Sequence, residues 1–130
     1  MGTEHTFYDY VEDGENLIRT WLAAQPPPVK AKFTNWLLHL EATPPGKWSR
    51  PYVDTLTDDC EGLFEVRVMV SRIQYRLLGC HDTGDRTPTL LHGFTKPGNK
   101  VPKAYCDTAL ERKETVRGDL RSHRAVHDYS

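Results

Sequence analysis

The sequence predicts an α+β fold in which an N-terminal helical hairpin packs on an antiparallel β-sheet and a C-terminal helix follows the sheet. Three observations predict it. Residues 62–102 form a three-stranded meander pattern, residues 15–42 contain two stretches with apolar side chains at helical spacing, and residues 101–116 contain a third. Because 130 residues can enclose one modest core, we expect a single domain over residues 1–130, with a polar tail from about residue 118.

The meander is indicated by the alternation of side chains along residues 63–70, 73–81 and 88–94. In the first of these strands, β-branched and aromatic side chains occupy every second position, namely Phe64, Val66, Val68 and Val70. A period of two is the pattern of a strand with one buried face. The other face carries charged side chains, so it is the face on which we expect the chemistry.

The short connection between the first two strands predicts their register. Only two residues separate them, so Val70 is expected opposite Ile73 and Arg67 opposite Arg76. Directly opposed like charges destabilise a sheet. Two interpretations stay open: Glu65, diagonal to Arg76, neutralises the pair, or an external anion does.

The third strand adds a histidine to the same face. If Cys80 pairs with Pro88, His92 lies across from Arg76, whereas a slip of one residue would turn it to the opposite face. A histidine in a strand is more often structural than catalytic. Beside two arginines and the basic loop that begins at Lys96, it is also a candidate for proton transfer near neutral pH.

Helix signals lie on both sides of the meander. Residues 15–24 have apolar side chains at helical spacing and end at a run of prolines, which cannot continue a helix. Residues 29–42 repeat the pattern, so the two stretches predict a helical hairpin on one face of the sheet. In the C-terminal helix over residues 101–116, Pro102 fits the first turn.

The two ends of the chain give weaker signals. Residues 6–11 are either an edge strand or a loose arm. Residues 121–130 are polar and expected to be frayed, although His123, His127 and Tyr129 leave room for a functional tail.

The net charge of −1 conceals a strong asymmetry. Residues 1–62 carry five Lys and Arg against ten Asp and Glu, whereas residues 67–103 carry seven Lys and Arg against two Asp. The near-neutral total does not favour bulk attraction to nucleic acid, but the basic half favours a local site for a phosphate. A solvated basic surface opposite an acidic one is the other interpretation.

Cysteines, histidines and hydropathy limit the classes of protein. Cys60, Cys80 and Cys106 show no metal-ligand spacing, and their odd number predicts free thiols in a reducing cytoplasm. None of the six histidines stands in an HExxH motif, so we expect neither a metal nor another cofactor. No apolar run approaches the ~20 residues that span a bilayer and no signal peptide is indicated, so we expect no membrane partner.

Several short motifs, taken in order, resemble a known family. They are LFEVRV, QYRLL and LLHGFTK in the three strands, then Pro102 and TALERK in the C-terminal helix. This series resembles the RelE/HigB superfamily of toxins from type II toxin–antitoxin modules, and in particular its HigB-like, phage-derived branch. The resemblance covers about residues 48–117, and the ordered set is more specific than any of its pieces.

The resemblance implies a RelE-like fold with helices on a strongly curved antiparallel sheet. It also implies an endoribonuclease that cuts mRNA, commonly on the ribosome, and a cognate helix-turn-helix antitoxin encoded beside it. The family's arginines fall on Arg67 and Arg76, and its basic residue after the strand-end phenylalanine falls on Lys96. Pro97 replaces the family's second lysine, and Lys100 is the nearest substitute.

Cleavage without a metal uses the ribose 2′-hydroxyl as nucleophile on the adjacent phosphate. It needs a base for the hydroxyl proton and cations for the charge of the transition state. We therefore expect catalysis from Arg67, Arg76, His92 and Lys96, with further RNA contacts from Arg72, Lys100 and Lys103.

Two other functions fit the same residues. The chain could be a non-enzymatic relative that acts by binding a protein, such as gyrase or an antitoxin, which the near-zero net charge and the missing second lysine favour. It could also be a structural domain whose basic strip only meets an acidic antitoxin.

Overall fold

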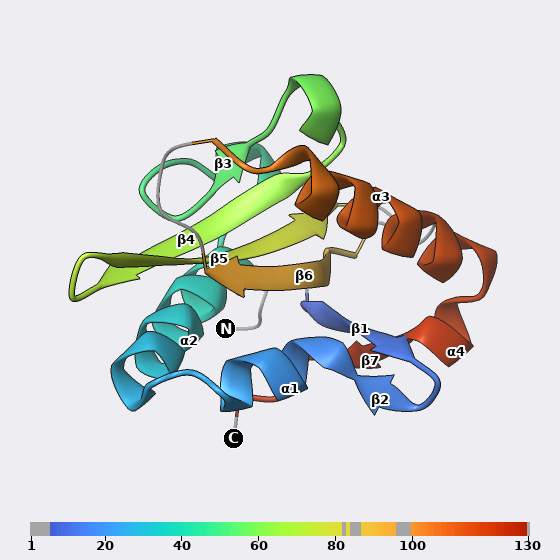
Figure 1. The fold of residues 1–130 in the computed structure, drawn as a ribbon, viewed down its shortest axis with the longest axis horizontal. Helices are drawn as coiled ribbons and strands as arrows, with labels where there is room; N and C mark the ends of the chain where they lie inside the picture. Colours follow the sequence, from blue (N-terminus) through green and yellow to red (C-terminus); the bar gives the residue numbers. More distant parts are fainter. Residues whose placement is uncertain (1–5, 82, 84–86, 96–99, 130) are drawn as a thin grey trace.

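A computed structural model describes residues 6–81, 83, 87–95 and 100–129 (Figure 1). The elements in chain order are β1 (Tyr8–Glu12), β2 (Glu15–Asn16), α1 (Leu17–Ala23), α2 (Pro27–Glu41), η1 (Pro45–Lys47), β3 (Asp54–Thr55), η2 (Asp58–Cys60), β4 (Phe64–Val70), β5 (Ile73–Cys80), β6 (Thr89–Thr95), α3 (Lys103–Gly118), α4 (Leu120–His123) and β7 (Arg124–Val126). Within the described ranges, no helix has the length and apolar character needed to cross a membrane.

One mixed sheet holds the fold together. Its strand order is β2-β1-β6-β5-β4-β3, and β7 pairs with β1. The β1–β6 pairing is parallel, and the other pairings are antiparallel. The predicted fold was therefore wrong in two respects: strands precede the helical hairpin, and the sheet is not purely antiparallel.

The aromatic character of the N-terminal segment explains this difference. Phe7 and Tyr10 are buried in the core, and the backbone N–H of Tyr8 donates to the carbonyl of Pro88 at 2.9 Å. Burying two aromatic side chains is worth several kcal/mol, on the order of 2 each. That gain favours a central position in the sheet over the edge strand or loose arm that local pattern suggested.

Helices α1 and α2 cover one face of the sheet. Against β6, α1 packs so closely that a Cβ atom at Gly93 would overlap the indole ring of Trp21. From α2, an apolar stripe enters the core, consisting of Val29, Phe33, Leu37 and Leu40. Both predicted helices and the proline connection are confirmed, although α1 begins at Leu17, where the Asn16 side chain caps it by accepting from Arg19 N at 2.8 Å.

Helix α3 covers part of the opposite face. Cys106 of α3 forms a disulfide with Cys60 of η2, and Cys80 is buried and takes no part in that bond. The expectation of three free thiols was therefore wrong. Because the two bonded cysteines are 46 residues apart, local spacing could not reveal that η2 and α3 lie together. The expectation of a reducing compartment rested on unpaired cysteines, and the Cys60–Cys106 disulfide removes that basis.

The C-terminal segment folds back onto β1. β7 pairs antiparallel with β1, so that Tyr8 lies opposite Val126. The backbone N–H of His127 then donates to the carbonyl of Phe7 at 2.9 Å. The expectation of a frayed tail over residues 121–130 is thus wrong for the described part of that segment.

Candidate nucleic-acid interface

The predicted register of β4 and β5 is confirmed. Val70 pairs with Ile73, and Arg67 pairs with Arg76. Ser71 and Arg72 form the connection with φ values of 53° and 68°, the left-handed backbone that matches the twist of a two-residue hairpin turn. Arg67 and Arg76 therefore do lie on one face of the sheet, the face toward α3.

Arg76 is enclosed on that face rather than presented to solvent. Its side chain has 0% exposure. One guanidinium nitrogen lies 3.3 Å from Glu65 Oε2, the other donates to Gln74 Oε1 at 2.6 Å, and the group lies 6.0 Å from the centre of the Phe94 ring. Of the two interpretations of the arginine pair, the structure shows the one in which Glu65 neutralises Arg76.

Glu65 is itself buried, although an ionised carboxylate is more stable in water. Burial raises the pKa of Glu65 above its ordinary value, against the opposing effects of Arg76 and then Arg67. A buried ion pair of this kind has little net value for stability, but removing one partner leaves a costly unpaired charge. The pair therefore fixes the local arrangement of β4 and β5.

His92 lies two residues further along β5 than predicted. His92 lies opposite Leu78, and Phe94 lies opposite Arg76. Two shifts of one residue each cause this difference: Cys80 pairs with Thr89 rather than with Pro88, and the register shifts again between Leu78 and Gly79. Such irregularities leave little trace in a sequence. His92 nevertheless stays on the same face as Arg76.

His92 is packed as an uncharged side chain. Its ring lies 5.2 Å from that of Tyr105 and 5.8 Å from that of Phe94, and Arg112 Nη1 approaches His92 Nδ1 at 3.4 Å. Burial, and secondly Arg112, lowers the pKa of His92 to about 4. The other ring nitrogen is buried and has no hydrogen-bond partner among the described residues. His92 is therefore poorly placed to exchange protons with a substrate.

Arg112 explains much of this packing. It donates to the carbonyl of Leu91 at 2.8 Å, and its guanidinium lies 4.9 Å from the centre of the Tyr10 ring. It thus ties α3 to β6 and β1. Arg112 is the arginine of the TALERK motif. This motif was recognised in the sequence, but its arginine was not predicted to join α3 to the sheet.

An open basic hollow lies at the outer edge of β4. β3 pairs with β4 only at Glu65 and Phe64, so the rest of that edge has no neighbouring strand among the described residues. We call this hollow of about 360 Å³ the β4-edge hollow. Its lining includes three cations, a tryptophan and two carboxylates, which are Lys32, Arg50, Arg67, Trp36, Asp54 and Glu65.

The cations of the β4-edge hollow are only partly neutralised by carboxylates of the protein. Arg67 is 33% exposed and lies 3.8 Å from Asp54, to which Arg50 also binds. Lys32 Nζ donates to the backbone carbonyl of Met69 at 2.9 Å. Since Glu65 already faces Arg76, one carboxylate balances three cations, and the hollow keeps a positive excess.

The remaining predicted residues fall in three places. Arg72 is exposed at the β4–β5 turn, three residues from Met69 of the β4-edge hollow. Lys96 lies outside the described residues. Lys100 and Lys103 line a separate hollow with Asp58 and Asp59, where Lys103 binds Asp107 at 2.8 Å.

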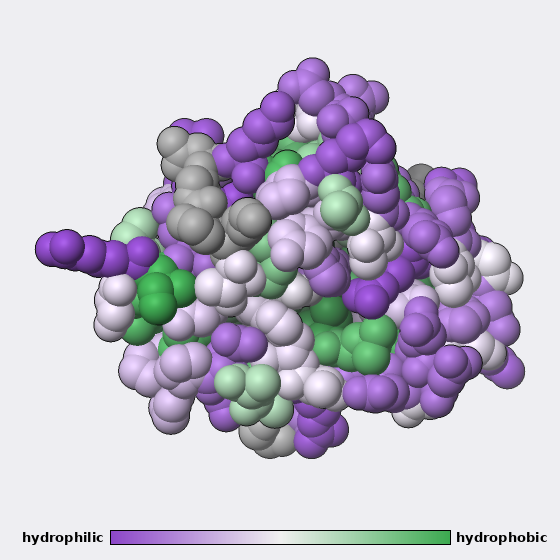
Figure 2. All heavy atoms as spheres, in the orientation of Figure 1, coloured by the Kyte–Doolittle hydropathy of each residue, from purple (hydrophilic) through white to green (hydrophobic). Residues whose placement is uncertain are grey.

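Apolar side chains also gather at the β4–β5 turn. Met69 and Ile73 are 51% and 46% exposed. In Figure 2 hydrophobic atoms lie at the left of the view, at the end of the molecule where Figure 1 places this turn. An exposed apolar group next to cations is typical of a contact surface.

Sequence reasoning did not select Lys32, Arg50 or Trp36. The lysine and tryptophan lie on an ordinary amphipathic helix, and the arginine lies in a loop, so no motif marks them. Their convergence depends on how α2 crosses the sheet. In the part of the chain that the structure describes, no group of three or more His, Cys, Asp and Glu side chains is arranged to hold a metal ion.

Comparison with protein-family models identifies a family for this chain. The family model of the phage-derived protein Gp49-like (DUF891) matches residues 20–114, from α1 into α3. Curated proteins and solved structures gave no match. Because the matched residues make up most of the chain, this protein belongs to the Gp49-like phage-derived family, a toxin-like family of the RelE/HigB type.

Proposed function

We propose that this chain is the toxin of a type II toxin–antitoxin module and that it cuts mRNA on the ribosome as a metal-independent endoribonuclease. Membership of a toxin-like family supports the first part. The observation that carries the second is the convergence of Lys32, Arg50 and Arg67 around an open hollow beside Trp36. Cations with an adjacent aromatic side chain can hold a phosphate and stack a base.

The predicted residues take different roles in this proposal. Arg67 and Arg72 contact the RNA backbone, helped by Lys32 and Arg50, and the resemblance adds Lys96. Arg76 and His92 take no direct part in cleavage, because Arg76 is buried and His92 is half-buried among aromatic rings. Lys100 and Lys103 contribute little, since Asp58, Asp59 and Asp107 surround them.

The experiment is incubation of purified protein with translating ribosomes, followed by mapping of mRNA ends. Wild type is expected to cut the mRNA and Arg67→Ala to cut it at least tenfold more slowly, since one phosphate-binding charge is worth on the order of 1–3 kcal/mol. Expression in cells should arrest growth, and a small helix-turn-helix protein encoded next to the gene should relieve the arrest. Intact mRNA together with normal growth would exclude the proposal.

A second candidate function is binding of a host protein without RNA cleavage. The enclosed Arg76, the uncharged His92 and the exposed Met69 favour it. A change in DNA supercoiling by gyrase, or tight binding of an antitoxin with intact mRNA, would distinguish this candidate. Substituting Met69 by Asp should then abolish the effect, whereas Arg67→Ala should leave it nearly unchanged.

A further inference from the structure

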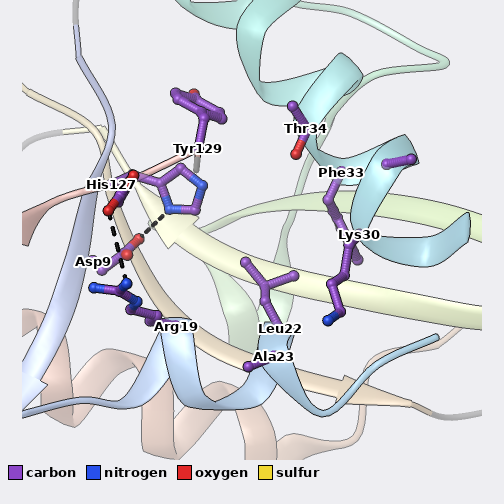
Figure 3. A pocket seen from close by; sticks show the side chains of 11 residues that line it. Asp9, Arg19, Leu22, Ala23, Lys30, Phe33, Thr34, His127 and Tyr129 are labelled. Carbon is purple, nitrogen blue, oxygen red and sulfur yellow. Dashed lines mark hydrogen bonds and ion pairs between the residues drawn. The ribbon is translucent and has the colours of Figure 1, made fainter. Parts of the chain in front are cut away.

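A second hollow lies between α1, α2 and the C-terminal segment (Figure 3). Its volume is about 460 Å³. The walls are partly apolar and partly charged, and they consist of Asp9, Arg19, Leu22, Ala23, Lys30, Ala31, Phe33, Thr34, His127, Asp128 and Tyr129. We call it the α1–α2 hollow. Neither Asp9 nor His127 falls within residues 20–114, so the family match says nothing about them.

A carboxylate–imidazole pair forms the floor of the α1–α2 hollow. His127 Nδ1 lies 2.7 Å from Asp9 Oδ1, and the two residues are 7% and 1% exposed. The other oxygen of Asp9 accepts from Asn16 Nδ2 at 3.0 Å. A carboxylate accepts hydrogen bonds, so Nδ1 of His127 carries the proton and Nε2 has a free lone pair. In Figure 3 Nε2 lies on the side of the ring away from Asp9, toward the space between α1 and α2.

The position of His127 is fixed from three sides. Its backbone N–H is bonded to Phe7, as described above, and Asp9 holds its ring. The ring of Tyr129 packs edge-on against it, with 4.7 Å between centroids. Burial, and then the nearby Glu41, raises the pKa of Tyr129. Tyr129 therefore keeps its proton and forms a wall of the hollow beside His127.

Two cations stand at the rim of the α1–α2 hollow. Arg19 of α1 lies 3.8 Å from Asp128 and has a side chain that is mostly exposed, and Lys30 of α2 is exposed. Figure 3 shows the amino group of Lys30 extending into the open space beside Leu22. A phosphate entering the hollow would thus meet positive charge before reaching the imidazole.

The other described histidines lack this combination. His39 stacks on Tyr52 at the protein surface, with centroids 3.8 Å apart. His123 has its Nδ1 at the carbonyl of Val11, at 3.1 Å, and its ring stacks on Tyr10. His81 packs against Trp48 and Phe64. None of these three lines the α1–α2 hollow or the β4-edge hollow.

We propose that His127 is the proton-transfer residue of the RNA cleavage proposed above, and that the α1–α2 hollow binds the reacting phosphate. This inference rests on the proposed function. The O2′–P bond forms while the P–O5′ bond breaks, and the 2′-hydroxyl proton passes to Nε2 and then to O5′. The products are a 2′,3′-cyclic phosphate and a 5′-hydroxyl. Asp9 stabilises the imidazolium between the two transfers, and Lys30 and Arg19 stabilise the phosphate.

The test compares His127→Asn with His123→Asn in the full chain. An asparagine amide at position 127 can still donate to Asp9 but has nothing in place of Nε2, so anchoring of the C-terminal segment is kept. We expect a ~10²–10⁴-fold lower single-turnover cleavage rate for His127→Asn, unchanged RNA affinity, and a wild-type rate for His123→Asn. In parallel, inorganic phosphate should shift the imidazole NMR signals of His127 in wild type but not in Lys30→Ala.

Each outcome decides a different point. Slow cleavage by His127→Asn, with a near-native thermal midpoint and a phosphate response at His127 in wild type, supports the inference. If His127→Asn cleaves within threefold of wild type, or phosphate leaves the His127 signals unchanged, the inference is overturned while the proposed ribonuclease function stands. If wild type cuts no RNA at all, the proposed function and this inference both fail.

Discussion

His92 lies on the α3 face of the sheet with a guanidinium at 3.4 Å from its Nδ1 and aromatic rings around it. His127 lies at the opposite side of the molecule with a carboxylate at 2.7 Å from its Nδ1. The cation next to His92 and its burial disfavour the protonated ring. The carboxylate next to His127 accepts from Nδ1 and so fixes the orientation of the ring.

The difference shows that residue type and strand position do not identify a reactive histidine. Two properties do: the charge that faces one ring nitrogen, and the space that faces the other. His92 was singled out from the sequence because Arg67, Arg76 and Lys96 were expected beside it, yet burial, and secondly Arg112, lowers its pKa. His127 has a buried partner and an open side, which is how an imidazole is prepared for proton transfer.

The largest expected effect concerns the sheet face around Arg76. Replacing Arg76 by Ala should lower the free energy of unfolding by about 3–5 kcal/mol, because it leaves the buried Glu65 without its partner. Denaturant unfolding measures this. The control is Arg67→Ala, which removes a half-exposed charge and should cost less than about 1 kcal/mol. An Arg76→Ala protein with wild-type stability and no activity would instead make Arg76 a catalytic group.

The next effect concerns the carboxylate beside His127. Asp9→Asn allows the amide to donate to Nδ1, which places the imidazole proton on Nε2 and blocks acceptance from the substrate. We expect a loss of ~10²-fold or more in the single-turnover cleavage rate, with His92→Gln within about threefold of wild type. If the two variants lose equal amounts of activity, the contrast between the two histidines has no bearing on catalysis.

A smaller effect concerns the pH dependence of stability. Between the ordinary pKa of 6.5 and about 4, the unfolded chain binds a proton at His92 and the folded chain does not. Stability should therefore fall as pH falls through this window and level off below it. His92→Gln should remove a component on the order of 1 kcal/mol, since solvent screens the partly exposed ring. Parallel unfolding curves for the two proteins from pH 7 to 4 would contradict the assignment.

The smallest effect concerns the β4-edge hollow. Lys32→Ala, which removes one cation near the RNA, should weaken binding of single-stranded RNA and reduce the slope of log affinity against log salt by about 1. Lys103→Ala serves as the matched control, because Asp107 and Asp59 already face that lysine, and its slope should stay as in wild type. Equal slopes for wild type and Lys32→Ala would show that Lys32 does not contact the RNA and that the RNA-binding surface lies elsewhere.

Local pattern determined much of the fold. The alternation in β4 and the two-residue connection sufficed to predict that Arg67 pairs with Arg76, because register follows from turn length and side-chain period. Helical spacing and prolines sufficed for α1 and α2. The bulge at Leu78, the parallel partner of β1 and the Cys60–Cys106 bond depend on contacts between distant segments, and no periodicity encodes them.

The candidate site was less predictable than the fold, for the same reason. Arg67 was found from its strand and its motif, but Lys32 joins it only because α2 crosses near β4. The separation is larger still for the α1–α2 hollow, where Asp9 and His127 are 118 residues apart in sequence. His127 was noted as part of a polar tail, and Asp9 lies within the stretch 6–11 that was expected to be an edge strand or a loose arm. No local pattern links the two residues.

The most direct measurement is the chemical identity of the RNA ends that the wild-type protein produces on mRNA bound to translating ribosomes. We expect a 2′,3′-cyclic phosphate on one fragment and a 5′-hydroxyl on the other, because the neighbouring 2′-oxygen is the nucleophile. Fragments with 3′-hydroxyl and 5′-phosphate ends, or mRNA that remains uncut, would contradict it.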